Sequence, residues 1–183
     1  AALEDIDRAV AGWVKADRDR DIQTVPVAVD DAAAMKRLGV KAVTGAVTAN
    51  KVKRALDALV ARLTPDYIVL LGAADVLPMF VVPNPSASDS GDDDEKLVPT
   101  DNPYACSKPF VSGRRSSYLV PDRVVGRIPD LPGSADPSWL VDYLQHAAAA
   151  RMRPVADYRR DLMICTATWK KAGEECAIAL GRD

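Results

Sequence analysis

Residues 67–71 have the sequence Tyr67-Ile68-Val69-Leu70-Leu71, and this continuous apolar run is the stretch that decides the fold. A strand that is apolar on both faces belongs inside a parallel sheet that is covered on both sides. The residues before it predict a helix that begins after an N-cap at Thr48 and ends at Thr64-Pro65. Its apolar face is formed by Val52, Leu56, Leu59, Val60 and Leu63. A helix that leads into a buried strand is half of an α/β unit.

The same kinds of pattern predict further elements on both sides of this unit. Additional helices are predicted at residues 3–17, from Asp30 or Asp31 to 38, at 136–152 and at 173–180. Additional strands are predicted at residues 24–29, 40–44, 123–128 and 162–166, the first of them at a sheet edge because it contains Pro26. The order of these elements predicts an α/β fold with an open, mostly parallel sheet and helices on both of its faces.

A long connection separates the two central strands. Residues 72–121 are rich in proline and contain an acidic run from Asp89 to Glu95, so we expect a long loop there instead of regular structure. The tip at residues 86–95 is the part that we expect to be disordered. A basic patch of Lys108, Arg114 and Arg115 is expected to be solvated or to contact the acidic run.

Composition excludes several classes of protein. The net charge is −2 and the 24 Lys and Arg residues are scattered, which argues against a nucleic-acid partner. No apolar run approaches the roughly 20 residues that cross a bilayer, so we expect no membrane span. The chain starts Ala-Ala without Met, which we interpret as a processing boundary that carries no information about the compartment.

Cysteine and histidine are scarce. Three cysteines without a CxxC pair form neither a disulfide framework nor a zinc site. We expect Cys165 and Cys176 to be core residues, and Cys106, in a loop, to be the most exposed thiol. His146 is the single histidine, and its place in the 136–152 pattern predicts a surface or half-buried helical residue. No Cys-His pair follows from these positions, so the chain by itself is predicted to have no peptidase activity.

Three segments along the chain have distinctive motifs. Residues 65–78 contain a strand that ends in Gly72, followed by Asp75 and a Leu-Pro step. Residues 99–105 contain Thr100-Asp101-Asn102-Pro103-Tyr104, a Thr-Asp-x-x-Tyr segment. Residues 118–129 contain a Pro-Asp step and a strand that ends Gly-Arg-Ile-Pro. In this order the three segments resemble the gingipain-type, caspase-like family of cysteine peptidases, and the resemblance covers roughly residues 48–180.

This resemblance implies a domain organisation. It predicts a caspase/gingipain-like first subdomain, with residues 1–47 as its N-terminal α/β portion and residues 48–157, including the loop 72–121, as its core. Residues 158–183 would then be the opening strand and helix of a truncated second, caspase-like subdomain. The family's catalytic Cys and His match no position of this chain, so no catalytic residue is assigned.

The resemblance also implies a function and partners. The chain would be the non-catalytic leading part of a cysteine endopeptidase and would support a downstream Cys-His subdomain of the same polypeptide. A peptide substrate is expected only for the full-length protein. The alternative is a non-catalytic interaction or regulatory α/β domain. An unpaired edge on the 162–166 strand is expected to cause dimerisation or crystal pairing through it, or else disorder after about Thr168.

Four residues are candidates for shaping the loops along the shared sheet edge: Asp75, Asp101, Tyr104 and Arg127. Asp75 and Asp101 follow strands on the side where open α/β sheets place ligand-facing loops. Arg127 is expected to bridge to one of these carboxylates as a planar fork. No cofactor is expected, although members of the family often hold calcium, and Asp75 with Asp101 is the candidate pair for such an ion.

Overall fold

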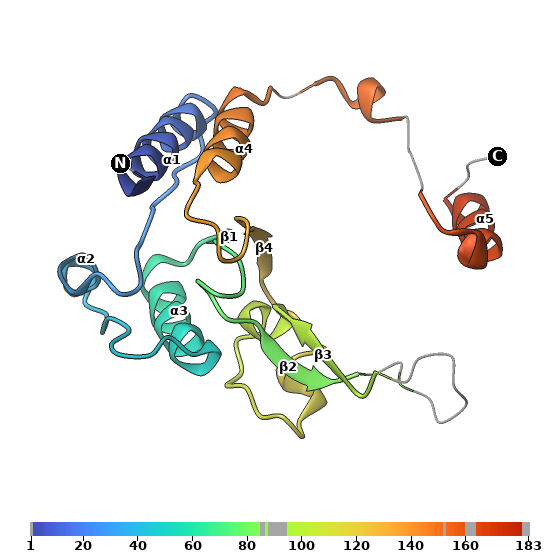
Figure 1. Ribbon diagram of the computed structural model, residues 1–183, viewed down its shortest axis with the longest axis horizontal. Coiled ribbons are helices and arrows are strands. Elements are labelled where there is room, and N and C mark those ends of the chain that lie inside the picture. Colours follow the sequence, from blue (N-terminus) through green and yellow to red (C-terminus); the bar gives the residue numbers. More distant parts are fainter. Residues whose placement is uncertain (1, 85–86, 88–94, 152, 160–163, 181–183) are drawn as a thin grey trace. The chain divides into compact units, whose positions relative to one another are not determined.

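The computed structural model describes residues 2–84, 87, 95–151, 153–159 and 164–180, without the side chains of Tyr158 and Arg159. The chain forms two compact units, residues 1–149 and residues 150–183 (Figure 1). The first unit contains, in chain order, α1 (Ala2–Arg18), α2 (Ala32–Arg37), α3 (Ala49–Leu63), β1 (Tyr67–Leu71), β2 (Phe80–Pro83), β3 (Leu97–Thr100), η1 (Asn102–Ala105), η2 (Arg115–Ser117), β4 (Val124–Ile128) and α4 (Ser138–Ala149). The second unit contains η3 (Val155–Arg159), η4 (Ala167–Trp169) and α5 (Lys170–Ala179).

The two central strands lie side by side as predicted. β1 pairs with β4 in parallel, with Tyr67 opposite Val124 and Leu71 opposite Ile128. The protein is therefore a mixed α/β protein with a small parallel sheet. In the described part of the chain this sheet has two strands, so the prediction that both are interior strands is wrong.

Helices pack against both sides of this sheet near its C-terminal end. Leu70 belongs to a core cluster with Val52 and Leu56 of α3. The neighbouring Leu71 packs with Ile128 against α1 and α4, in a cluster that contains Leu140 and Leu144. Because successive side chains of a strand point to opposite faces, α3 and the α1–α4 pair cover different faces.

The capping signals explain the helix boundaries. The Thr48 hydroxyl accepts from the Lys51 backbone N–H at 3.4 Å, and α3 ends at Thr64, whose φ of 46° is left-handed. Asp31 accepts from two backbone N–H groups of α2 at 2.8 and 3.0 Å, which selects it over Asp30 as the cap. Asp136 accepts from the Ser138 N–H at 2.9 Å, and α4 then ends at Ala149, short of the predicted 152.

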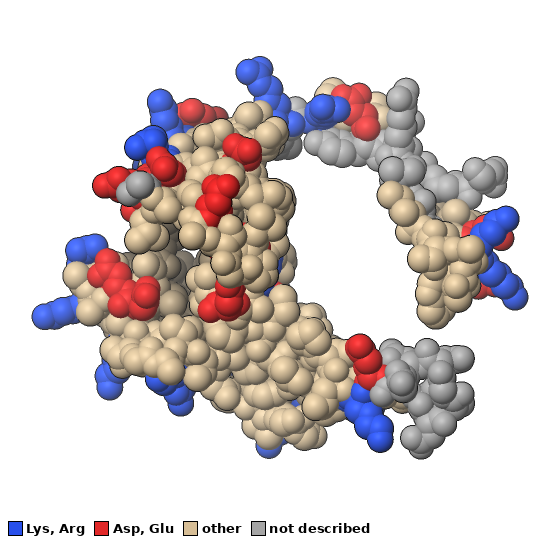
Figure 2. All heavy atoms as spheres, viewed as in Figure 1, with Lys and Arg blue, Asp and Glu red and all other residues tan. Residues whose placement is uncertain are grey.

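The long connection 72–121 contains regular structure, contrary to the prediction. β2 and β3 form an antiparallel hairpin in which Phe80 and Val82 point into the α3 core cluster. Val81 and Leu97, on the opposite face, are 56% and 59% exposed. On the face drawn in Figure 2, the surface around this hairpin is largely free of charged side chains. The predicted disordered tip lies almost entirely outside the described residues.

Three predicted strands are wrong where the structure describes them. Residues 24–29 and 40–44 form no strand, although the Val43 N–H donates to the Val29 carbonyl at 2.8 Å. Their apolar residues instead pack with Met35 against the second side of α3. In the predicted strand 162–166, residues 164–166 are irregular and Ile164 is 85% exposed. α5 confirms the last predicted helix but begins three residues earlier, and none of the described residues of this unit is buried.

Burial of the central strands also differs from the prediction. Tyr67 and Val69 of β1 are 73% and 45% exposed, and Val124 of β4 is 57% exposed. These side chains share one face, because paired residues of parallel strands point to the same side. Leu71 lies on the same face and packs against α1 and α4, so this face is covered at its C-terminal end and open at Tyr67, Val69 and Val124.

Candidate functional site

Arg127 forms the predicted planar fork, and its partner is Asp101. Arg127 lies in β4 and Asp101 directly follows β3. The Arg127 Nε donates to Asp101 Oδ2 at 2.7 Å and Nη2 donates to Oδ1 at 2.7 Å. The Arg127 side chain is 8% exposed and that of Asp101 is 24% exposed. A bidentate pair with this little solvent contact is among the stronger polar interactions in proteins.

The remaining donors of Arg127 bind the loop after β1. Nη1 donates to the Gly72 and Ala73 carbonyls at 2.6 and 3.2 Å, and Nη2 donates to the Leu77 carbonyl at 2.9 Å. All five N–H groups of the guanidinium are therefore used within the chain. The loop depends on glycine at position 72, where φ is +121° and a Cβ would lie 3.0 Å from the Val76 side chain. We refer to Arg127, Asp101 and these carbonyls as the Arg127 cluster.

Tyr104 binds the end of the same loop. Its ring is buried, and its hydroxyl donates to the Pro78 carbonyl at 2.6 Å. Burial raises the pKa of the Tyr104 hydroxyl far above its usual range, and the nearby Asp101 carboxylate raises it further. The hydroxyl therefore stays protonated and acts as a hydrogen-bond donor to the loop.

Asp75 does not join the Arg127 cluster. Its Oδ2 accepts from the Gly133 backbone N–H at 2.9 Å, at an exposed position. Both oxygens of Asp101 already accept from Arg127. Within the described residues there is no group of three or more His, Cys, Asp or Glu side chains placed to hold a metal ion. The structure thus gives Asp75 and Asp101 different hydrogen-bond partners.

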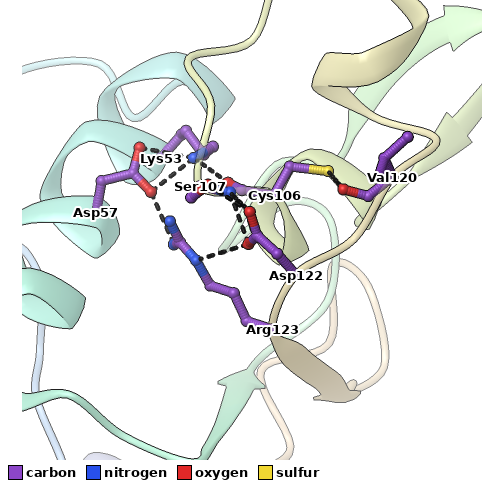
Figure 3. A network of polar contacts seen from close by, with 7 residues as sticks. All are labelled: Lys53, Asp57, Cys106, Ser107, Val120, Asp122 and Arg123. Carbon is purple, nitrogen blue, oxygen red and sulfur yellow. Dashed lines mark hydrogen bonds and ion pairs between the residues drawn. The ribbon is translucent and has the colours of Figure 1, made fainter.

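A second charged cluster was not predicted, and it centres on Lys53 of α3 (Figure 3). Lys53 is 2% exposed, and its Nζ contacts both Asp57 oxygens at 2.6 Å and donates to the Cys106 carbonyl at 2.7 Å. Arg123 Nη1 donates to Asp57 Oδ1 at 2.8 Å. The buried ammonium is therefore paired and fully hydrogen-bonded, which is the condition for keeping a charge away from water.

The Lys53 cluster continues through the start of β4. Arg123 Nε lies 3.6 Å from Asp122 Oδ1. Asp122 accepts from the Ser107 backbone N–H at 2.9 and 3.1 Å and from the Ser107 hydroxyl. The Ser107 hydroxyl, its backbone N–H and the adjacent Arg123 lower the pKa of the Asp122 carboxyl. Two cations and two carboxylates thus balance, and together they join α3, the segment after η1 and β4.

The sequence contains one local signal for this cluster. Lys53 and Asp57 are four residues apart on α3, a spacing at which opposite charges meet on a helix. A lysine is almost never fully buried, so this spacing by itself indicates an exposed ion pair on the helix surface. Arg123 lies 66 positions from Asp57, so only the tertiary structure reveals the pairing.

The cysteines lie where they were not expected. Cys106 is buried, not exposed, and its thiol donates to the Val120 carbonyl at 3.3 Å. Burial raises the pKa of the Cys106 thiol. Cys165 and Cys176 are exposed and not in a core.

The histidine is confirmed as an exposed helical residue. The His146 ring Nδ1 lies 2.7 Å from the Asp142 carbonyl of its own helix. No described contact joins this imidazole to a thiol, and the buried Cys106 lacks the paired base that a nucleophilic thiolate needs.

No family model, curated protein or solved structure matches the chain. The resemblance to gingipain-type peptidases therefore rests on the residues quoted for it. None of the helices in the described part of the chain combines the length and apolar character that a bilayer crossing requires.

Proposed function

We propose that this chain is the non-catalytic leading part of a gingipain-like cysteine endopeptidase and supports a Cys-His subdomain of the same polypeptide. One observation carries the proposal: the Arg127 cluster joins the three segments on which the resemblance rests. Arg127 belongs to the Gly-Arg-Ile-Pro segment, Asp101 to the Thr-Asp-x-x-Tyr segment, and Gly72, Ala73 and Leu77 to the strand that ends in Gly. The three segments therefore meet around the Arg127 guanidinium, and we call the loop after β1 that they hold the rim.

The supporting role follows from how the rim is held. Arg127 and the hydroxyl of Tyr104 bind four backbone carbonyls of the loop after β1, and no donor of the guanidinium is left for a ligand. A loop held in this way is preorganised, and it can present a fixed surface to a neighbouring catalytic subdomain. Substrate binding and bond cleavage are assigned to that subdomain.

The second candidate is a non-catalytic interaction or regulatory domain, and a specific observation favours it. Apolar side chains are exposed on the open face of the β1–β4 sheet and on the outer face of the β2–β3 hairpin, among them Tyr67, Val81 and Leu97. Exposed apolar patches on a folded domain mark surfaces that contact other proteins.

The deciding experiment compares the reading frame that encodes this chain with the activity of its product. We expect a His-Gly step and, after a further apolar strand, a Cys beyond residue 183, and thiol-dependent peptidase activity that a Cys→Ala change at that position abolishes. Residues 1–183 alone, tested on a panel of fluorogenic peptides, should be inactive. A frame without these residues would favour the interaction domain, and hydrolysis by residues 1–183 that one of their own Cys→Ala changes abolishes would overturn both candidates.

A further inference from the structure

The outer edge of β1 has unpaired backbone groups. The Gly72 N–H donates to the Ile128 carbonyl at 2.8 Å. This bond shows which residues of β1 direct their backbone groups toward β4. In a parallel ladder the backbone groups of alternate residues face the partner strand. Those of Ile68 and Leu70 therefore face β4, and those of Tyr67, Val69 and Leu71 point to the other side.

Nothing in the described part of residues 1–149 pairs with this edge. No described hydrogen bond reaches the backbone N–H or C=O groups of Tyr67, Val69 or Leu71 from outside the ladder. η1 contacts β4, the other strand of the sheet. Parallel strands normally lie within larger covered sheets, and unpaired edges are templates for another strand.

The pattern on this edge is self-complementary. If a second copy of β1 lies antiparallel across a two-fold axis at Val69, Val69 meets its own copy, and Tyr67 meets Leu71 of the second copy. Each of these pairs is of the hydrogen-bonded type, because all three residues direct both backbone groups outward. Their side chains lie on the same face of the sheet, so the exposed Tyr67 ring gains an apolar cross-strand neighbour.

We propose that β1 is a homodimerisation strand, and that two copies of this chain join their β1 edges, antiparallel and centred on Val69, into one four-stranded sheet. Such an interface is isologous, because the same surface serves both copies. This inference goes beyond the proposed function and does not depend on it. It also differs from pairing through residues 162–166, because it uses only β1.

The test exploits the position of Val69 on the two-fold axis. In Val69→Lys, two ammonium groups would lie directly opposite each other, and in Val69→Asp, two carboxylates would. Each variant should weaken dimerisation by roughly fivefold or more in analytical ultracentrifugation of the full chain, whereas an equimolar mixture of the two should regain a dimer. Val111→Lys is the matched control, because Val111 is as exposed as Val69, at 45%, and lies in the loop between η1 and η2.

The outcomes separate cleanly. Val111→Lys should dimerise like the unsubstituted chain, and circular dichroism should show that all variants keep the fold. A chain that remains monomeric up to a concentration of about 1 mM would overturn the proposal, since a dissociation constant above this value does not indicate a specific interface. Dimers that survive Val69→Lys, or single variants whose mixture stays monomeric, would overturn it as well.

Discussion

Two charged clusters tie loops to the β1–β4 sheet, and they are built on different principles. The Arg127 cluster uses one planar guanidinium whose five donors bind a carboxylate and three carbonyls. The Lys53 cluster uses a point charge and a second cation, Arg123, which share the Asp57 carboxylate. An arginine fork has a fixed geometry, whereas an ammonium adapts to whichever acceptors surround it. The Arg127 cluster therefore depends on one residue, whereas the Lys53 cluster depends on several residues that partly compensate for one another.

The largest effect should come from Arg127→Ala. This change leaves the largely buried Asp101 carboxylate unpaired and frees three carbonyls of the loop after β1. Removing one partner of a buried pair costs about 3 kcal/mol or more, so the free energy of unfolding in urea should fall by that amount. Arg127→Lys, which keeps the charge but not the fork, should still lose roughly 2 kcal/mol. If Arg127→Lys had the same free energy of unfolding as the unsubstituted chain, the charge of Arg127, and not the geometry of its fork, would hold the rim.

The Lys53 cluster should respond differently to changes at its two ends. Asp57→Ala leaves the ammonium of Lys53 buried with the Cys106 carbonyl as its remaining acceptor, so we expect a loss of about 3 kcal/mol. Lys53→Met removes the buried charge and leaves Asp57 paired with Arg123, so the loss should be about 1 kcal/mol. Urea unfolding of the two variants measures the difference. Equal losses would mean that the two cations do not share Asp57 in solution.

A smaller effect should appear at acid pH. The folded-state pKa of Asp122 is lowered, mainly by the Ser107 hydroxyl, so this carboxylate stabilises the fold above its unfolded-state pKa. That contribution is lost as the pH falls through the folded-state pKa. Asp122→Asn should therefore unfold with a shallower acid dependence below about pH 4. Asp31 and Asp136, whose pKa values are also lowered by backbone N–H groups, would account for the dependence that remains. An unchanged slope in urea titrations at several pH values would contradict the role of Asp122.

The smallest expected effect is a difference in the rates at which the three cysteines of the native chain react with a thiol reagent. Cys106 is buried beside the Lys53 cluster, whereas Cys165 and Cys176 are exposed. We expect a thiol reagent to label the two exposed cysteines of the native chain rapidly, and Cys106 only when the fold opens. Mass spectrometry of digested protein distinguishes the three sites. Lys53→Met should accelerate labelling of Cys106 if the cluster restrains that segment.

The sequence predicted that Arg127 bridges as a planar fork to Asp75 or Asp101, because a guanidinium matches the geometry of a carboxylate. The choice of Asp101 was made by the tertiary structure, since Asp101 follows β3 of the separate β2–β3 hairpin. The helices were predicted from local signals, since the caps at Asp31, Thr48 and Asp136 act within their own first turns.

Other features depend on residues that are far apart in the sequence. The burial of Lys53 requires Cys106 and Arg123, and the burial of Cys106 requires Val120. The apolar segments 24–29 and 40–44 have the composition of strands, yet they pack against α3 without a strand partner. Strand propensity cannot decide such cases, because a strand is stabilised by its neighbours in the sheet.

The amino-acid sequence by itself determined the helices, their caps, the two parallel strands and the arginine fork, because each is encoded by spacing or by a residue's own chemistry. The tertiary structure alone decided which charges are buried, which thiol is hidden and which edge of the sheet is left unpaired. Those properties depend on how distant segments pack, since burial and pairing are set by neighbours in space and not by neighbours in the chain.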